Sequence, residues 1–259
     1  MKWSSSIVLI RHGQSEYNVL RKRKENDPEY QSFKKSFDKG ERQSIETVLL
    51  ASKLRERYVP KVGDYKTPLT KEGKRQAFLT GKALSEAEIP FPRVIFYSPY
   101  LRTVQTLKGL RAGWEKLLRV EVIADDRIRE QEHGLSSIYG DRRLFHFFNP
   151  EQEELRCLLG PYWYQYPQGE SVSQVRDRIR LMTTMLIREW AEKNVWLVTH
   201  HLTILSIRAN IEHLTDEEFI RIDEEEKPLN CGITIYGCNL NAGKDGKMEL
   251  VCYNKRLFD

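Results

Sequence analysis

The stretch Ile7-Val8-Leu9-Ile10-Arg11-His12-Gly13 decides the fold that this sequence predicts. Its four successive apolar residues, most of them β-branched, are typical of a short strand that is covered on both faces. The polar residues that follow mark a turn, which would place Arg11 and His12 at the carboxyl end of that strand. A strand buried on both faces indicates a parallel sheet between two layers of helices.

The rest of the chain alternates between short apolar runs and amphipathic stretches. The predicted strands are 94–97, 120–123 and 195–199, with a late hairpin at 233–236 and 248–253. The predicted helices are 101–110, 172–191 and 202–214, and another begins after Thr70, whose hydroxyl suits an N-cap. Strands that alternate with helices predict an α/β fold, a three-layer αβα sandwich with a largely parallel central sheet.

The composition limits the class of protein. The chain has 259 residues, of which 40% are hydrophobic and 31% charged, as in a folded globular protein. This length suits one large α/β domain or two small ones, and we expect a single domain over 1–259. The formal net charge of +5 is too small to indicate a nucleic-acid partner. No apolar run approaches the roughly 20 residues that span a membrane. We therefore expect the protein to bind neither nucleic acid nor a membrane.

The cysteines and the N-terminal residues bear on location. Four cysteines contain no C-x-x-C pair and demand neither a disulfide framework nor a zinc site. The first residues lead straight into the first strand, without the long apolar region of a signal peptide. We therefore expect reduced thiols and a cytoplasmic protein. A homodimer is left open.

One segment, at about 19–66, interrupts the alternation of strands and helices. It starts with the basic run Arg21-Lys22-Arg23-Lys24 and contains a candidate helix at 43–58. A long excursion beside a reactive turn is often a lid or a substrate-selecting cap, and a solvated surface insertion is the alternative. We expect the basic run to be solvated, and the alternative is that it binds a polyanionic substrate.

Polar side chains follow three of the predicted strands. Arg11 and His12 end the first, Arg102 follows the second, and His200 and His201 end the strand at 195–199. Ligands of open α/β sheets bind outside the carboxyl ends of the strands, so these side chains should share one crevice. Guanidinium groups match phosphate oxygens and an imidazole can attack phosphorus, which indicates a phosphorylated small-molecule substrate.

The motifs now resemble a known family. Arg11-His12-Gly13-Gln14-Ser15-Glu16-Tyr17-Asn18 is similar to the R-H-G-x-S-x-x-N signature of the histidine phosphatase superfamily (phosphoglycerate mutase-like, branch 1). Five further blocks follow in the family's order: Pro68-Leu69-Thr70-Lys71-Glu72-Gly73, Ser98-Pro99-Tyr100-Leu101-Arg102-Thr103-Val104-Gln105-Thr106, Arg129-Glu130-Gln131-Glu132-His133-Gly134, Pro167-Gln168-Gly169-Glu170-Ser171 and Val198-Thr199-His200. The resemblance runs from about residue 7 to about residue 236 and implies a phosphoglycerate mutase-like fold with an inserted cap.

The resemblance also implies roles for individual residues. His12 would be the covalent nucleophile, with its second ring nitrogen donating to a backbone carbonyl. The phosphoryl oxygens would be held by Arg11, Arg102 and His200, with further hydrogen bonds from Ser15 and Asn18. Glu130 would be the proton donor to the leaving alcohol, and the nearby Glu132 is the alternative. His201 stands where many members carry glycine, so its side chain either adds a donor or points away.

These roles imply a phosphatase that needs no metal and no cofactor. A zinc site built from His12, His200 and His201 lacks matching carboxylate or cysteine spacing, and the arginines would repel a cation. The segment after R-H-G lacks the F-x-G-W-x-D-like block of phosphoglycerate mutases, so we expect phosphohistidine to be discharged to water. The alternatives are a cofactor-dependent phosphoglycerate mutase-type phosphotransferase and a non-catalytic module that binds a phosphate ligand.

Overall fold

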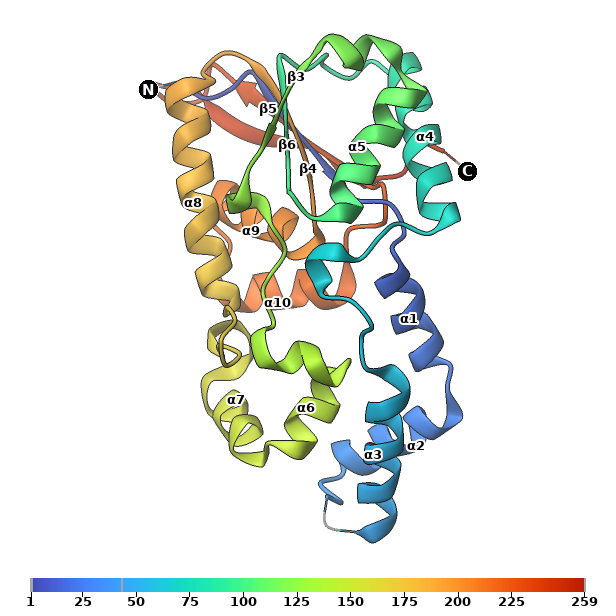
Figure 1. Cartoon of the computed structure of the whole chain (residues 1–259). Helices are drawn as coiled ribbons and strands as arrows, with labels where there is room; N and C mark the ends of the chain where they lie inside the picture. Colours follow the sequence, from blue (N-terminus) through green and yellow to red (C-terminus); the bar gives the residue numbers. More distant parts are fainter. Residues whose placement is uncertain (1, 43, 259) are drawn as a thin grey trace. The chain divides into compact units, whose positions relative to one another are not determined.

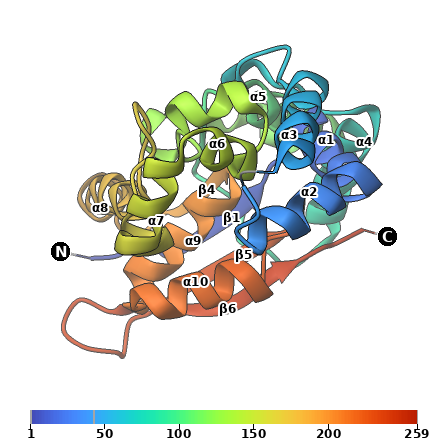
Figure 2. The same ribbon diagram turned by 90° about the horizontal axis from the view of Figure 1, so that it is seen from below.

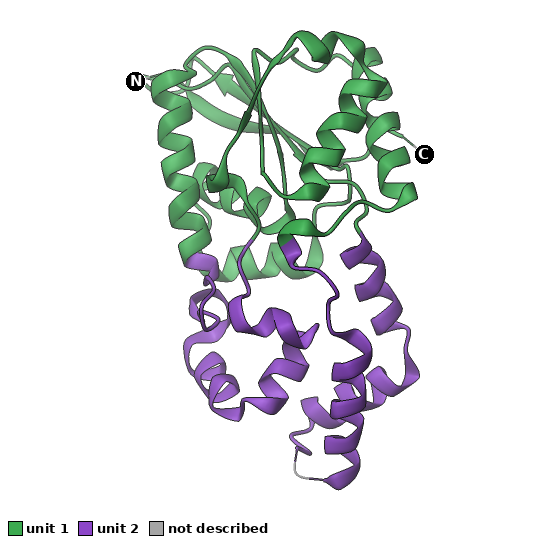
Figure 3. Ribbon diagram, in the orientation of Figure 1, with its two compact units in different colours: residues 1–15, 65–130, 174–259 green, residues 16–64, 131–173 purple. Residues whose placement is uncertain are grey.

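The computed structural model describes residues 2–42 and 44–258 (Figure 1). The chain divides into two compact units, each described by itself below (Figure 3). Unit 1 comprises Met1–Ser15, Tyr65–Glu130 and Gln174–Asp259, and unit 2 comprises Glu16–Asp64 and Gln131–Ser173. The predicted insertion at 19–66 falls almost wholly in unit 2. Unit 2 also contains Gln131–Ser173, which the sequence pattern did not associate with the insertion.

Unit 1 contains a six-stranded sheet in the order β3-β2-β4-β1-β5-β6. The strands are β1 (Ser6–Arg11), β2 (Val94–Tyr97), β3 (Glu121–Ala124), β4 (Asn194–Thr199), β5 (Ile233–Asn239) and β6 (Lys247–Lys255). The first four strands pair in parallel, whereas β5 pairs antiparallel with both β1 and β6. The predicted fold class, the largely parallel sheet and the late hairpin are therefore confirmed.

Helices cover both faces of this sheet. The side chains of β1 alternate between two buried apolar clusters, with Ile7 and Leu9 in one and Val8 and Ile10 in the other. The first cluster includes residues of α8 (Val172–Glu189) and α9 (His201–Glu212), and the second includes residues of α4 (Lys71–Glu86) and α5 (Leu101–Gly113). This explains why the strand is apolar at every position: neither face meets water.

The helix boundaries follow local signals. Thr70 caps α4 by accepting the Gly73 N–H at 2.9 Å, as predicted. A capping box of Thr215 and Glu218 begins α10 (Asp216–Glu225), which lies beside α9 in two views (Figures 1 and 2). The glutamates of α10 are exposed and Asp216 and Asp223 are half-buried, while Phe219 is buried. No helix in the described part of the chain is long and apolar enough to cross a membrane.

Unit 2 is helical. Its helices are α1 (Glu16–Glu25), α2 (Pro28–Asp38), α3 (Ile45–Tyr58), α6 (Arg142–Phe148) and α7 (Pro150–Trp163). The predicted helix at 43–58 corresponds to α3, and Gln43 lies outside the described residues. An aromatic-rich core joins both stretches of the unit, with Phe33 packing edge-on against Phe147 at a centroid distance of 5.5 Å.

Lys24 corrects the interpretation of the basic run. Arg21, Lys22 and Arg23 are exposed, as expected, but Lys24 is buried and forms an ion pair with Asp141. The same carboxylate accepts a hydrogen bond from the Tyr30 hydroxyl at 2.9 Å. The prediction of a solvated charge run is therefore wrong for Lys24, because a carboxylate distant in the sequence compensates its burial.

Candidate active site

The carboxyl ends of β1, β2 and β4 bring the predicted site residues together within unit 1. These strands are neighbours in the sheet and parallel, so the residues that follow them lie at one edge. The ring centroids of His12 and His200 are 5.2 Å apart, and Arg102 hydrogen-bonds to His200. The predicted convergence of these three side chains is confirmed.

The turn that carries His12 is held by buried polar contacts. The His12 N–H donates to the Thr199 carbonyl at 2.9 Å, and the Gly13 N–H donates to Thr106 Oγ1 at 3.0 Å. A Cβ atom added to Gly73 would lie 2.0 Å from the Gln14 carbonyl oxygen. Only glycine permits this approach, so the two separate sequence blocks around Gly13 and Gly73 form one packed structure.

The tautomer of His12 follows from its surroundings. Its Nδ1 lies 2.7 Å from the Gly13 carbonyl oxygen, which can only accept a hydrogen bond. Nδ1 therefore carries the proton, and the lone pair of the neutral ring is on Nε2. Burial, followed by the positive charges of Arg102 and Arg11, holds the pKa of His12 well below its usual range. The ring is neutral at pH 7, as a nitrogen nucleophile must be.

His200 is fully buried, and both of its ring nitrogens are engaged. Nδ1 accepts from Nε of Arg102 at 3.3 Å, and Nε2 lies 2.8 Å from Ser98 Oγ. Because arginine is always a donor, the neutral ring presents Nε2–H to Ser98. Burial and then the charge of Arg102 hold the pKa of His200 well below its usual range. His200 thus orients the Arg102 guanidinium. Its predicted contact with a phosphoryl oxygen stays a prediction.

Arg102 lies in the first turn of α5 and is 4% exposed. Its Cζ atom is 4.9 Å from the centroid of the Tyr100 ring, and that ring is 5.1 Å from His200. An aromatic face and an imidazole therefore fix the guanidinium plane. Arg11 is anchored differently, since its Nη1 donates to the Pro228 carbonyl. Both arginines act electrostatically on His12.

The Glu130 segment is anchored at the end of β4. Arg178 donates to the carbonyls of Arg127 at 2.6 Å and of Glu130 at 3.0 Å. Thr199 and Thr203 donate to the next carbonyls, those of residues 128 and 129, at 2.6 and 2.7 Å. These three positioning residues were not singled out by the sequence analysis. The threonines flank His200 and could have been noticed, whereas Arg178 looks like any exposed arginine of an amphipathic helix.

The remaining predicted site residues lie in different settings. Ser15 is buried in unit 1 and forms a β-bridge with Leu69. His201 is the first residue of α9, and its Nε2 lies 2.8 Å from Asp223 Oδ1 on α10. Asn18 belongs to α1 of unit 2. Glu132 also belongs to unit 2, where its N–H donates to Glu170 Oε2 at 3.1 Å. The choice between Glu130 and Glu132 as proton donor stays a prediction.

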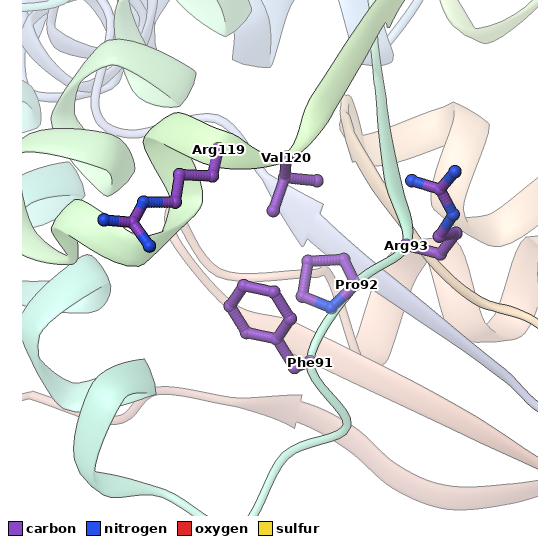
Figure 4. Close-up of a pocket in the computed structure, with 5 residues that line it drawn as sticks. All are labelled: Phe91, Pro92, Arg93, Arg119 and Val120. Atoms are coloured by element: carbon purple, nitrogen blue, oxygen red, sulfur yellow. The ribbon is translucent and has the colours of Figure 1, made fainter.

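A shallow pocket lies elsewhere in unit 1. It is lined by Phe91, Pro92, Arg93, Arg119 and Val120, and its two guanidinium groups extend away from one another (Figure 4). These residues precede β2 and β3, at the opposite edge of the sheet from His12. The pocket is therefore separate from the histidine site. Within residues 2–42 and 44–258, no group of three or more histidine, cysteine, aspartate or glutamate side chains is arranged to hold a metal ion.

A family model matches a part of the chain that contains several of these residues. The model of the histidine phosphatase superfamily (branch 1) matches residues 55–244, which is most of the chain. The matched residues include Arg102, Glu130 and His200 and begin after His12. His12 itself lies outside the matched range. In the structure, the turn that carries His12 packs against Gly73, which is inside that range.

Named relatives in plants and bacteria are similar in sequence. Phosphoglycerate mutase-like protein AT74H of Arabidopsis thaliana is 32% identical over 159 residues, which cover 54% of this chain and 54% of that protein. The related protein AT74 is 31% identical and matches over 54% of this chain and 47% of its own length. The chain spans about half the length of these curated relatives. A 2,3-bisphosphoglycerate-dependent phosphoglycerate mutase of Rhizobium etli is 24% identical, with 85% and 86% of the two chains covered.

Solved structures share the fold. The α-ribazole phosphatase from Shigella flexneri superimposes with a TM-score of 0.66 at 15% identity, covering 98% of each chain. A mycobacterial glucosyl-3-phosphoglycerate phosphatase in complex with inorganic phosphate gives a TM-score of 0.63 at 17% identity, covering 98% of this chain and 99% of its own. At these identities the likeness concerns the fold alone.

Proposed function

The chain belongs to the histidine phosphatase superfamily, branch 1, and from that membership we propose that it is a metal-independent phosphatase that hydrolyses a small phosphomonoester. The observation that carries the proposal is the tautomer of His12. A buried, neutral ring with its proton on Nδ1 has its Nε2 lone pair available for attack on phosphorus.

In the first proposed step, His12 Nε2 attacks the phosphorus atom and forms an N–P bond while the ester P–O bond breaks. The leaving alcohol oxygen takes a proton from the carboxylic acid of Glu130. Arg11 and Arg102 stabilise the charge on the equatorial oxygens, and His200 holds Arg102 in place. Ser15, Asn18 and His201 are proposed as further hydrogen-bond donors to the phosphate.

In the second proposed step, water attacks the phosphohistidine. Glu130, now a carboxylate, takes a proton from that water, the N–P bond breaks and inorganic phosphate leaves. The lone pair returns to Nε2, and the cycle closes without a cofactor. Water is the only co-reactant in this sequence of events, which requires neither an oxidant nor a reductant.

Transfer to a second acceptor is the competing outcome, since the Rhizobium etli relative is named as a phosphoglycerate mutase. Such a mutase would exchange 2- and 3-phosphoglycerate and respond to 2,3-bisphosphoglycerate. We expect no such exchange, because the block that phosphoglycerate mutases carry after R-H-G is replaced here by α1–α3 of unit 2.

The decisive experiment measures hydrolysis of 4-nitrophenyl phosphate in the presence of EDTA. We expect turnover by the wild-type protein and a loss of at least about 10³-fold in kcat/KM for His12→Ala, because the nucleophile is removed. The exposed His213→Gln variant is the matched control and should keep full activity. Trapping of ³²P on the wild-type protein, but not on His12→Ala, would identify the intermediate. Wild-type protein without activity on any phosphomonoester would contradict the proposal and favour a binding module.

A further inference from the structure

An exposed tyrosine stands beside the phosphate-site residues of unit 1. Tyr65 lies in the short 3-10 helix Asp64–Lys66 and is 53% exposed. Its ring packs edge to face against the buried Tyr100, with centroids 5.4 Å apart and an angle of 74° between the planes. One side of the Tyr65 ring is therefore held against Tyr100, while much of the ring is exposed to solvent.

Tyr100 links this exposed ring to the chemistry. Its centroid is 5.1 Å from that of His200, and the Arg102 guanidinium carbon is 4.9 Å from the same ring. Tyr65, His200 and Arg102 therefore all contact the ring of Tyr100.

We propose that Tyr65 is a specificity-determining residue that stacks against a ring in the alcohol part of the substrate. The substrate class would be a phosphate monoester whose alcohol carries an aromatic ring near the ester oxygen. This inference rests on the proposed function and deepens it, since it names a residue that would contact the leaving alcohol in the same site.

The physical basis is the geometry of aromatic contacts. Tyrosine presents a large apolar face at a low cost in side-chain entropy, because only two torsions must be fixed. Tyr65 is already restrained by Tyr100, so less freedom is lost when a ligand ring packs on it. Stacking of a ligand ring on an aromatic side chain changes affinity by about 10-fold.

The test compares benzyl phosphate with ethyl phosphate, two esters of primary alcohols in which a phenyl ring takes the place of a methyl group. The measured quantity is the ratio of their kcat/KM values. We expect Tyr65→Ala to lower this ratio about 10-fold through the KM of benzyl phosphate, while hydrolysis of ethyl phosphate stays within about twofold. Tyr65→Phe, which keeps the ring, should retain the wild-type ratio.

Two further variants separate stacking from structural support. Tyr65→Leu still covers Tyr100 but has no aromatic face, so it should behave as Tyr65→Ala does. Phe91→Ala removes another exposed aromatic residue, 43% exposed, at the opposite edge of the sheet and should change nothing. Equal losses for both esters in Tyr65→Ala, or a wild-type ratio in Tyr65→Leu, would overturn the stacking role. Absence of wild-type turnover on both esters would instead contradict the proposed function itself, and with it the role of Tyr65.

Discussion

Arg102 of unit 1 and Lys24 of unit 2 are both buried cations, but they contact groups of different kinds. In unit 1 the buried Arg102 hydrogen-bonds to the neutral imidazole of His200. In unit 2 the buried Lys24 pairs with the carboxylate of Asp141. An imidazole and an aromatic ring orient the guanidinium of Arg102, whereas a carboxylate neutralises the ammonium of Lys24 within the fold. The two buried cations therefore have different expected roles, Arg102 as a candidate phosphate ligand and Lys24 as structural support.

The largest effect on stability is expected from Lys24→Met. This change leaves the Asp141 carboxylate buried without its cation and should lower the free energy of unfolding by about 4 kcal/mol. Urea unfolding measures the loss. Lys22→Met, two residues before the buried position on the same helix and exposed, is the control and should stay near wild type. Equal stability of the two variants would show that the Lys24 pair does not support unit 2.

Gly73→Ala should be the next most damaging change. The new Cβ atom would collide with the Gln14 carbonyl oxygen and displace the turn that carries His12, at a cost of about 3 kcal/mol. Both the melting temperature and phosphatase activity should fall. Gly63→Ala in unit 2 is the matched control, because a Cβ atom there meets no atom within 4 Å. Retained activity in Gly73→Ala would mean that the close approach is dispensable.

Arg102→Lys tests whether the buried cation of unit 1 acts on the substrate. Lysine keeps the charge but loses the planar fork and the contact with His200, so kcat/KM should fall about 100-fold. Arg111→Lys on the same helix should leave the rate unchanged. Steady-state kinetics on 4-nitrophenyl phosphate measures both. If Arg102→Lys destabilised the protein without slowing turnover, Arg102 would resemble Lys24, and the contrast between the units would fail.

The smallest expected effect concerns His146 in unit 2. Burial lowers the pKa of His146 to about 4, against the opposing influence of Glu153. Because the unfolded chain binds a proton below pH 6.5 and the folded one does not, the stabilising contribution is present above pH 6.5 and lost as the pH falls towards 4. Unfolding free energies at pH 7 and pH 5 should differ by about 2 kcal/mol less in His146→Leu than in the wild type. The exposed His213→Gln should keep the wild-type difference.

The pKa of His12 is also lowered, and this predicts the pH dependence of activity. Since its pKa lies well below the usual range, the nucleophile stays neutral as the pH falls below 6.5. The acid limb of kcat/KM should therefore lie well below pH 6.5. An acid limb centred near 6.5 would show that the site is more hydrated than the burial of His12 implies.

The sequence by itself determined the sheet, its helical layers and the edge at which the polar residues gather. Strand 7–10 and the run at 195–199 are apolar at successive positions, and such runs can only be buried between two layers. Parallel strands then force the residues after them to one edge, so His12, Arg102 and His200 could be brought together without coordinates.

Only the tertiary structure decided which polar groups meet. Lys24 and Asp141 are 117 residues apart, and no local pattern tells a paired lysine from a solvated one. The same holds for the hydrogen bonds from Arg178 to the segment of Glu130 and for the contact between His201 and Asp223. Apolar periodicity fixes the direction in which each side chain points relative to its own element. The identity of the partner depends on how distant elements pack, and that is settled only when the whole chain has folded.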